Sequence, residues 1–324
     1  MRSLRIHGVR DVRVDEIAEP EPREGEVLLR VTAVGLCGSD LHWYEEAAIG
    51  DARVLEPFVL GHEFVGVIET GPRRGERVVG DPADPCGTCG PCVRGLEHLC
   101  DQMRFAGHAP VDGALRQRIA WPSRLLHRVP DGISDDAAVL LEPLGVALHA
   151  LEVGRAHPSI CASVHGCGPL GLLVIATLRA QGVERVIATD PLAHRAAAAN
   201  SLGAEINVVV PPDRVDVAFE CSGEDDALQS AIAGTRPGGT IVLAGIPRGD
   251  TTTFHAAGAR RKELALLLCR RMRSDDLARA IDLVERTGLD LGPLVTHRFD
   301  LAEGQRTFET LAARSGIKVV VRPS

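Results

Sequence analysis

The sequence predicts an α/β protein in two parts, a β-rich barrel-like lobe and a doubly wound parallel sheet. Three observations support this fold class. Short alternating runs separated by turns fill the first 130 residues, strands and helices alternate from about residue 148, and a glycine-rich turn joins the first of those strands to its helix. A chain of 324 residues is long enough for about two domains that each bury a core.

The composition is that of an ordinary soluble globular protein. Charged residues make up 25% of the chain and apolar residues 45%, which argues against disorder. The net charge of −8 does not support nucleic-acid or membrane binding, since both favour a basic surface. No apolar run approaches the ~18 residues of a membrane span, and residues 1–8 lack the apolar centre of a signal peptide. We expect a cytoplasmic protein without nucleic-acid or membrane partners.

The N-terminal lobe is predicted from period-two patterning. Residues 12–14 and 27–31 read as strands on either side of a Glu- and Pro-rich turn, and apolar runs at 65–68 and 77–79 continue the pattern. Because no long helical period interrupts these runs, we expect a barrel-like lobe that extends to about residue 130.

Candidate metal ligands stand in two short stretches of this lobe. Cys37 begins the run that contains Ser39 and His42, and His62 and Glu63 follow further along the chain. A thiolate, an imidazole and a carboxylate suit a tetrahedral zinc, and three protein ligands with one open position describe a catalytic zinc. Considered alone, the same residues fit a small core cysteine and a polar surface pair equally well.

A second metal pattern is more specific. Cys86, Cys89, Cys92 and Cys100 form a C-x2-C-x2-C-x7-C run in a segment rich in Gly and Pro. Closely spaced thiols in a reducing compartment indicate a metal site before a disulfide framework, and four thiolates close a structural zinc site. The other cysteines, Cys37 excepted, are interpreted as packing residues.

Another carboxylate stands where the pattern changes from strands to helices. Ser134 or Asp135 can cap a helix, and Glu142 precedes Pro143 among leucines. An unpaired carboxylate is costly in apolar surroundings, so we expect either a metal partner for Glu142 or an exposed place on a helix.

The strongest local motif begins at the end of a predicted strand at 160–165. Gly166, Gly168 and Gly171 form G-x-G-x-x-G before a helix at 172–181, and the next strand ends in Asp190. This is the Rossmann dinucleotide fingerprint in its required context, with the diphosphate at the helix N-terminus. Asp190 is expected to bind the adenosine ribose hydroxyls and to repel a 2′-phosphate, which favours NAD over NADP.

The doubly wound pattern continues to the C-terminus. Predicted strands at 215–219 and 240–244 end in turns that contain Ser222 and Gly245, where such sheets bind ligands. A strand at 264–269, an amphipathic helix capped by Ser274 or Asp275, and a final strand at 317–321 complete the chain.

Together these motifs identify a family resemblance over essentially the whole chain. The sequence resembles the zinc-dependent medium-chain dehydrogenases/reductases, and within them the polyol (sorbitol, L-iditol, L-idonate) and threonine dehydrogenase branch. The matching stretches are 37–42, 61–63, the four-cysteine segment, 142–144, 166–171 and 293–297. The resemblance implies a GroES-like catalytic domain at 1–147 and 273–324, and an NAD-binding Rossmann domain at 148–272.

The resemblance also implies roles for individual residues. Cys37 and His62 would bind the catalytic zinc, and Glu63 or Glu142 would supply a third ligand, directly or through a water. Ser39 would accept the alcohol proton and pass it to His42 through the nicotinamide ribose. The remaining implied positions are the nucleotide turn Gly166, Gly168, Pro169, Leu170 and Gly171, the adenosine-side Asp190 and Arg195, and the substrate-side Phe105 and Arg271.

Two segments depart from the family pattern. The connection from 203 to 215 is nearly direct, so a surface helix beside the adenine edge is expected to be missing, with an effect on cofactor affinity. Residues 266–272 replace a glycine and aromatics that are common near the polyol pocket, which leaves the exact substrate open.

The leading hypothesis is an NAD- and zinc-dependent oxidoreductase acting on a secondary alcohol of a polyol, sugar acid or cyclitol. The alternatives are an amino-alcohol, amino-cyclitol or threonine dehydrogenase and, more remotely, a non-catalytic protein that binds zinc and nucleotide. Family likeness implies a homo-oligomer, a tetramer rather than a dimer. The direction of the reaction and the hydroxyl that is oxidised are not predicted.

Overall fold

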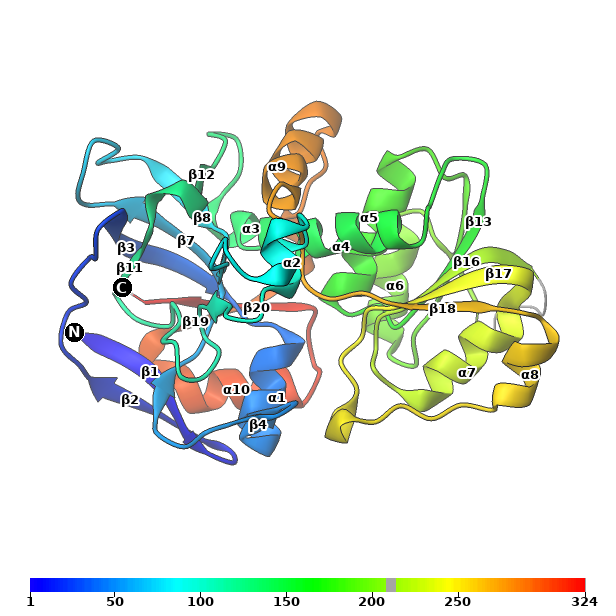
Figure 1. Ribbon diagram of the computed structural model, residues 1–324, viewed down its shortest axis with the longest axis horizontal. Coiled ribbons are helices and arrows are strands. Elements are labelled where there is room, and N and C mark those ends of the chain that lie inside the picture. The colour runs from blue at the N-terminus through cyan, green and yellow to red at the C-terminus, as the bar shows by residue number, and fades with distance from the viewer. Residues whose placement is uncertain (208–213, 324) are drawn as a thin grey trace. The chain divides into compact units, whose positions relative to one another are not determined.

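The computed structural model describes residues 1–207 and 214–323, which form two compact units. The first comprises Met1–Glu142 and Asp290–Ser324, and the second comprises Pro143–Leu289 (Figure 1). The second unit extends beyond the predicted 148–272 at both ends, because most of α4 (Leu141–Val153) and all of α9 (Asp276–Thr287) belong to it. The roles expected of the two parts stay predictions.

The first unit is built on a seven-stranded sheet in which the N-terminal strands and the C-terminal strands pair. Its order is β12-β8-β7-β3-β20-β19, and β11 pairs with β3. The strands are β3 (Glu26–Gly35), β7 (Glu63–Ile68), β8 (Arg77–Gly80), β11 (Arg118–Pro122), β12 (Leu126–Arg128), β19 (Val295–Asp300) and β20 (Lys318–Arg322). The predicted strands at 27–31, 65–68, 77–79 and 317–321 all lie in this sheet.

Smaller elements complete the first unit. A three-stranded sheet runs in the order β2-β1-β6, and two hairpin pairs stand apart from it. The remaining elements are β1 (Arg2–Gly8), β2 (Asp11–Glu16), α1 (Gly38–Glu46), β4 (Ala48–Ile49), β5 (Ala52–Arg53), β6 (Phe58–Val59), β9 (Ala83–Asp84), α2 (Gly90–Val93), β10 (Arg104–Phe105), α3 (Asp135–Ala138) and α10 (Gly304–Ala312). Short 3₁₀ turns cover Glu97–Leu99, Ser123–Leu125, Gly292–Leu294 and Leu301–Glu303.

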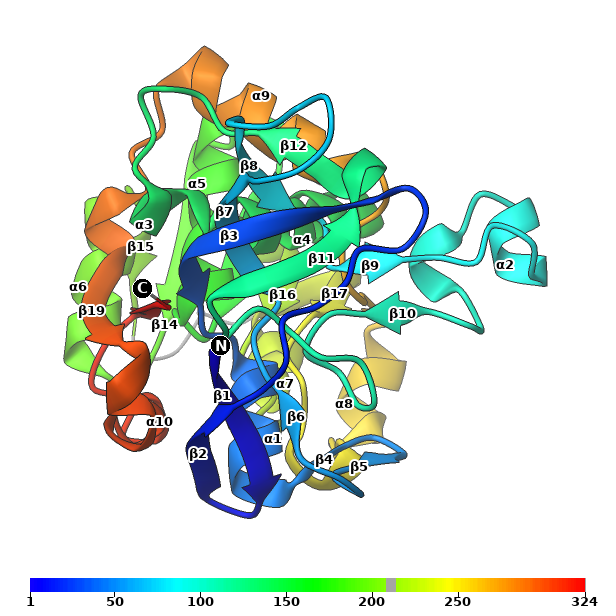
Figure 2. The same ribbon diagram turned by 90° about the vertical axis from the view of Figure 1, so that its left-hand side faces the viewer.

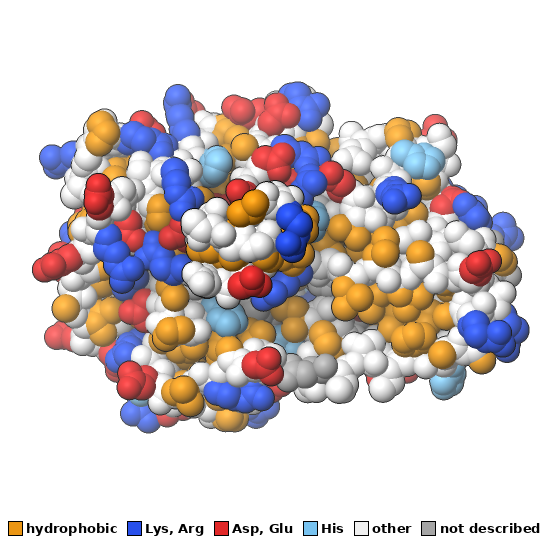
Figure 3. Space-filling view, in the orientation of Figure 1, with side chains coloured by type: hydrophobic (Ala, Val, Ile, Leu, Met, Phe, Trp, Pro, Cys, Tyr) orange, Lys and Arg blue, Asp and Glu red, His pale blue; other side chains and the backbone are white. Residues whose placement is uncertain are grey.

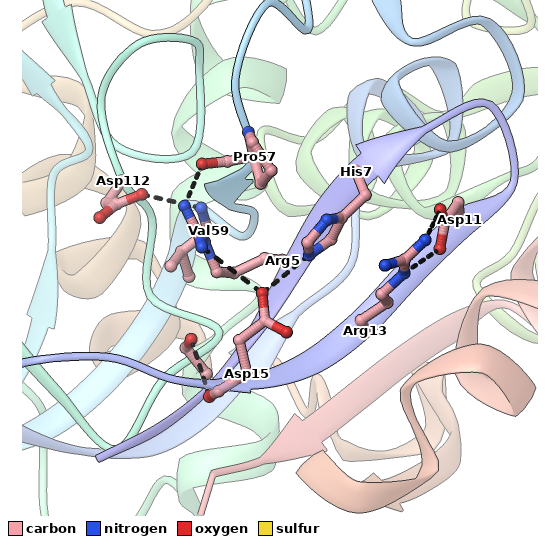
Figure 4. A network of polar contacts seen from close by, with 9 residues as sticks. Arg5, His7, Asp11, Arg13, Asp15, Pro57, Val59 and Asp112 are labelled. Atoms are coloured by element: carbon pink, nitrogen blue, oxygen red, sulfur yellow. Dashed lines mark hydrogen bonds and ion pairs between the residues drawn. The ribbon is translucent and has the colours of Figure 1, made fainter.

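A polar network fixes the small sheet to the loop that precedes β6. The carboxylate of Asp15 on β2 lies 2.7 Å from Nε2 of His7 and 3.4 Å from Nη1 of Arg5, both on β1 (Figure 4). Arg5 also donates to the carbonyl oxygen of Pro57. The backbone nitrogen of Val59 on β6 donates to Oδ1 of Asp112 at 2.8 Å. Side chains as well as the backbone hydrogen bonds between strands therefore hold this edge together.

The C-terminal strand β20 lies inside the large sheet. It runs parallel to β19 and pairs antiparallel with β3 through Val320–Gly35 and Val321–Val34. Its residues 318–321 are buried, as the apolar run predicts for a strand with neighbours on both sides. Figure 2 shows the red C-terminal strand at the label C, next to the orange-red β19 with which it pairs.

The second unit is a doubly wound sheet, as the alternation of strands and helices predicts. Six strands of the described chain pair in parallel in the order β15-β14-β13-β16-β17-β18. Its elements besides α4 and α9 are β13 (Cys161–His165), α5 (Pro169–Ala180), β14 (Arg185–Thr189), α6 (Ala193–Ser201), β15 (Glu205–Ile206), β16 (Val215–Glu220), α7 (Asp225–Gly234), β17 (Thr235–Leu243), α8 (Ala256–Arg261) and β18 (Ala265–Leu268). A 3₁₀ turn covers Arg248–Asp250.

The sequence predicted that a surface helix between 203 and 215 and a membrane-spanning segment are both missing. The predicted loss of a surface helix between 203 and 215 falls partly on residues 208–213, which lie outside the described residues. Within the described ranges, every helix is too short or too polar to cross a bilayer.

An ion triad connects the helix before Glu142 to the C-terminal strands. Asp136 of α3 accepts hydrogen bonds from Nε of Arg298 (2.5 Å), and from Nη2 and Nε of Arg322 (2.7 and 3.1 Å). Burial opposes ionisation of Asp136, but the hydrogen bonds from Arg322 and Arg298 lower its pKa below the ordinary value. The carboxylate therefore stabilises the folded state above its ordinary pKa.

We predict that Asp136→Ala lowers the free energy of unfolding by about 1–3 kcal/mol at pH 7, since it removes hydrogen bonds to charged groups. Because the folded-state pKa is depressed, the difference between wild type and variant should shrink as the pH falls through that pKa. Urea unfolding at pH 7 and pH 3 measures both. Asp131→Ala is the control, because Asp131 is 89% exposed and its ion pair with Arg128 is longer, at 3.4 Å, and open to solvent. An equal loss in both variants would contradict the prediction.

Candidate functional site

The predicted zinc ligands of the two N-terminal stretches come together in the first unit. The sulfur of Cys37, a ring nitrogen of His62 and a carboxylate oxygen of Glu63 all lie within 4.8 Å of one another. The strand ladder explains this, because Gly35 at the end of β3 is paired with Glu63 at the start of β7. Cys37 follows β3 directly and is the N-cap residue of α1.

Asp40, which the sequence analysis did not assign, connects the two stretches. Its carboxylate is fully buried and accepts hydrogen bonds from the backbone nitrogens of Cys37 (2.9 Å) and Gly61 (3.2 Å). Oδ1 also lies 3.8 Å from Nδ1 of His62. Asp40 therefore fixes the backbone beside both ligands and faces the imidazole, as carboxylates do behind metal-bound histidines.

Glu63 has one oxygen engaged and one without a hydrogen-bond donor. Oε2 forms an ion pair with Nζ of Lys318, which also donates to the carbonyl oxygen of Leu36 (3.0 Å). Oε1 is buried, and none of the residues that the structure describes donates a hydrogen bond to it. An orphaned buried carboxylate oxygen beside a thiol and an imidazole fits a metal ion. The donor set present is therefore suited to zinc.

Glu142 lies in the same buried region, at the first turn of α4. It is not among the three residues whose ligand atoms cluster, but it interacts electrostatically with His62 and Glu63. Burial raises the pKa of Glu142 to about 8; His62 opposes that shift, and Glu63 and Asp81 add to it. The expectation of an exposed Glu142 is wrong, because its side chain is buried.

The imidazole of His62 carries a strongly shifted pKa. Burial lowers this pKa, but Asp40, Cys37 and Glu142 outweigh that effect and raise it to about 10. The negative groups around His62 thus favour a cation at this position, either a proton or a metal. The ring of Phe105 packs against it with centroids 5.4 Å apart, so this predicted substrate-side residue lies beside the ligand cluster.

The two residues of the predicted proton relay share one face of α1. Ser39 and His42 stand three positions apart, which places them on neighbouring turns of the helix. Nδ1 of His42 lies 2.9 Å from Oε1 of Glu46, and Ser39 is half-buried. Glu46 can hold the histidine ring in one orientation.

The four clustered cysteines form the second predicted metal site. All nine cysteines of the chain are free thiols, and the sulfurs of Cys86, Cys89, Cys92 and Cys100 lie together. Neighbouring sulfurs are 3.4–3.7 Å apart. Four thiolates about 2.3 Å from one zinc would be separated by roughly 3.8 Å, so this group already has the size of an occupied tetrahedron.

Backbone groups support the sulfurs. The nitrogens of Cys86 and Gln102 each donate to Cys100, and that of Cys89 donates to Cys86, at 3.3–3.4 Å. Hydrogen bonds from Thr88 lower the pKa of Cys86 to about 6, whereas burial raises that of Cys92 to about 12. Burial thus opposes ionisation of Cys92, and a bound cation would be needed for all four sulfurs to be thiolates.

The glycine fingerprint forms the turn between β13 and α5. Gly166 has a φ of +92°, and a Cβ on Gly171 would come within 1.9 Å of the carbonyl oxygen of Gly166. Gly168 caps α5 without a side-chain hydrogen bond, and Pro169 and Leu170 follow it. A turn of this tightness, open at a helix N-terminus, fits the diphosphate of a dinucleotide.

The adenosine-side residues lie at the same edge of the sheet. Asp190 follows β14 and accepts hydrogen bonds from the backbone nitrogens of Cys167 (2.7 Å) and Leu192 (2.8 Å). These bonds fix the carboxylate beside the glycine turn. A Cβ on Gly168 would lie 3.6 Å from Nη1 of Arg195, which places this guanidinium at the turn as well.

The remaining predicted positions follow β16, β17 and β18. Ser222 donates from its nitrogen (2.7 Å) and its hydroxyl (2.5 Å) to Glu220, a buried residue that the sequence analysis did not single out. A Cβ on Gly245 would come within 2.2 Å of the nitrogen of Gly223, so these two turns touch. Arg271 follows β18 with a φ of +58°.

The chain is similar to known proteins over nearly its whole length. The family model "Alcohol dehydrogenase GroES-like domain" matches residues 23–131, and "Zinc-binding dehydrogenase" matches 169–286. A probable D-xylulose reductase A from Aspergillus clavatus is 33% identical over 98% of this chain and 96% of its own. Sorbitol dehydrogenase from Bacillus subtilis is 31% identical over 100% and 98%. An alcohol dehydrogenase from Escherichia coli, solved with NADH, superimposes with a TM-score of 0.88, at 26% identity over 99% of both chains.

These full-length similarities agree with the resemblance that the motifs indicated, and with the predicted GroES-like and Rossmann folds. The chain belongs to the family of zinc-dependent medium-chain dehydrogenases/reductases, in its polyol dehydrogenase branch, and is an oxidoreductase that works with zinc and a nicotinamide nucleotide.

Proposed function

We propose that the cluster of Cys37, His62 and Glu63 is the catalytic zinc site, at which a secondary alcohol of a polyol, sugar acid or cyclitol is oxidised with NAD. The single observation that carries this assignment is the buried Oε1 of Glu63, which accepts no hydrogen bond from the described residues and lies beside a thiol and an imidazole. Glu63 is then the direct carboxylate ligand, and Glu142 stays in the outer shell, where a water can lie between it and the metal.

When bound, zinc supplies Lewis acidity that favours loss of the alcohol proton. The residues of the chain would accept the proton and balance the charge of the site. Ser39 would accept that proton, and His42, whose Nδ1 lies 2.9 Å from Oε1 of Glu46, would be the next proton acceptor along the same face of α1. The buried acids Asp40 and Glu142 balance the charge of the ligand cluster, and Phe105 covers one side of His62.

NAD is the hydride acceptor that the second unit favours. The turn made by Gly166, Gly168 and Gly171 would hold the diphosphate, and the guanidinium of Arg195 lies beside this turn. Asp190 is fixed by two amides and keeps lone pairs for the ribose hydroxyls, while its charge disfavours a 2′-phosphate. The E. coli relative carries NADH, in agreement with this choice.

The relatives named sorbitol dehydrogenase and D-xylulose reductase support polyols as substrates. The four cysteines at 86–100 are proposed to hold a structural zinc, because all four positions of the tetrahedron are filled by protein sulfurs.

The proposal predicts two zinc ions per chain and NAD reduction with a polyol such as sorbitol. Cys37→Ser should retain one zinc and lose at least about 10³-fold in kcat/KM, because a ligand of the reacting metal is gone. Elemental analysis of the purified protein and NADH absorbance measure these outcomes.

The control is Cys161→Ser, a half-buried thiol outside both clusters. It should keep two zinc ions and full activity. A wild-type protein with one zinc, or a Cys37→Ser variant that still oxidises polyols, would contradict the proposal. NADP tested beside NAD decides the choice of nucleotide.

Zinc uptake at the catalytic site should strengthen with pH. The pKa of His62 in the metal-free protein is about 10, so below that pH the metal must displace a proton from the ring. The apparent affinity should then rise about tenfold per pH unit between pH 6 and 9 for each proton displaced. Competition with a chelator at pH 6, 7 and 8 tests this, and a flat profile would refute it.

We also propose that the protein is a cytoplasmic homo-oligomer. Nine free thiols suit a reducing compartment. The edge strand β18 carries Leu267 and Leu268, which are 36% and 82% exposed, and Figure 3 shows apolar side chains gathered on this face. An exposed apolar strand edge favours pairing with a second copy around a two-fold axis. This contact accounts for a dimer, and the expected tetramer requires a second surface.

Leu268→Lys should therefore lower the oligomeric state, because a buried unpaired charge in a strand-to-strand contact is costly. Light scattering after gel filtration measures the mass. Leu55→Lys, at a residue 90% exposed in the first unit, is the matched control and should leave the mass unchanged. A monomeric wild type, or an unchanged Leu268→Lys variant, would exclude this interface.

A further inference from the structure

Lysine is almost absent from this chain. Lys262 and Lys318 are the only lysines among 36 basic residues, all others being arginine. Arginine and lysine differ in that lysine concentrates its charge and three donors on one small nitrogen at the end of a narrow stem. The two positions that keep lysine are therefore informative about space and geometry.

Both lysines use that compact nitrogen. Nζ of Lys262 donates to the carbonyl oxygens of Ile232, Ala233 and Thr235 at 2.8–3.0 Å, at the end of α7. Nζ of Lys318 donates to Leu36 at 3.0 Å and pairs with Oε2 of Glu63. Of these two lysines, Lys318 is the one that contacts a residue of the proposed zinc site, Glu63.

The ion pair of Lys318 and Glu63 is packed against Gly35. Lys318 and Glu63 are both fully buried. A Cβ on Gly35 would come within 2.2 Å of Oε2 of Glu63 and 3.2 Å of Cε of Lys318, so the pair lies directly against bare backbone. A side chain at position 35 would therefore displace the carboxylate and crowd the lysine stem.

The two oxygens of Glu63 thus have different roles. Oε2 is held by Lys318, and Oε1 is the buried atom that no described residue hydrogen bonds. Lys318 is in turn fixed to Leu36, the residue before Cys37. One ammonium group therefore connects the backbone next to the thiol ligand with the carboxylate ligand.

We propose that Lys318 is a positioning residue of the catalytic zinc site, which holds Oε2 of Glu63 so that Oε1 faces the metal. It acts through Glu63 and touches neither substrate nor nucleotide in this role. The inference rests on the proposed zinc site. Residues behind metal ligands commonly change metal affinity 10–100-fold when they are removed, which sets the expected effect.

A pure charge effect predicts the opposite sign. Removing a cation that stands next to a Zn²⁺ site would strengthen metal binding, since like charges repel. Positioning predicts weaker binding. The direction of the change therefore separates the two accounts.

The test compares Lys318→Met with Lys262→Met, both in the full-length protein with cobalt in place of the catalytic zinc. Lys318→Met should release cobalt to a chelator 10–100-fold more readily and should shift the cobalt d–d bands, which report the ligand set. Lys262→Met loses a lysine that is anchored by three hydrogen bonds at the end of α7 in the second unit, and it should change neither. In a Glu63→Gln background, Lys318→Met should add less than about twofold, because its effect passes through Glu63.

A second readout needs no activity. With ¹⁵N-lysine labelling, only two side-chain ammonium signals exist, and loading the catalytic site should shift the one that disappears in Lys318→Met. Uptake of one metal by the four cysteines shows that the variant has folded.

Unchanged or tighter cobalt binding in Lys318→Met, or a fall in melting temperature with an unaltered cobalt spectrum, would overturn the proposal. A wild type that binds metal only at the four cysteines would instead refute the catalytic zinc site itself.

Discussion

Several acidic groups share one buried space in the first unit, and the cost of placing their charges there governs the surrounding structure. Asp40, Glu63, Asp81 and Glu142 are all at most 5% exposed, and a thiol stands among them. Buried carboxylates need cations or donors, and here these are backbone amides, one imidazole and one ammonium group. Burial raises the pKa of Glu142, with Glu63 and Asp81 adding to the shift, and the negative groups around His62 raise the pKa of that ring against the effect of burial; a divalent cation would balance this charge.

The functional features that could be predicted from the sequence are those carried by local motifs. The four cysteines, the glycine turn with Asp190, and the stretch at 61–63 each carry their chemistry within a few residues, and backbone pairing brings the remaining ligand to them. The β3–β7 ladder that aligns Gly35 with Glu63 joins two strands that the apolar patterns at 27–31 and 65–68 predicted. Even the cap of α3 by Ser134, whose hydroxyl accepts from Ala137, was predictable from its residue type.

Long-range partners were not predictable in the same way. Lys318 stands 282 positions from Leu36 and reads as an ordinary strand residue; only the scarcity of lysine could have drawn attention to it. Asp81 gave no signal at all, since it lies in a loop whose burial depends on the fold. The extent of the second unit was also hidden, because α9 has the amphipathic pattern of a helix that could pack on either unit.

The place of β20 inside the large sheet has a consequence for biosynthesis. A ribosome completes Cys37, His62 and Glu63 early, yet the strand that carries their lysine emerges only after the whole second unit has been made. Until then, Glu63 lacks its counter-ion, and Val34 and Gly35 at the end of β3 lack their pairing with β20. The four cysteines have no such dependence, since their ligands lie within one short segment. The four-cysteine cluster can therefore assemble early, whereas the cluster of Cys37, His62 and Glu63 is complete with its lysine only once β20 has been made.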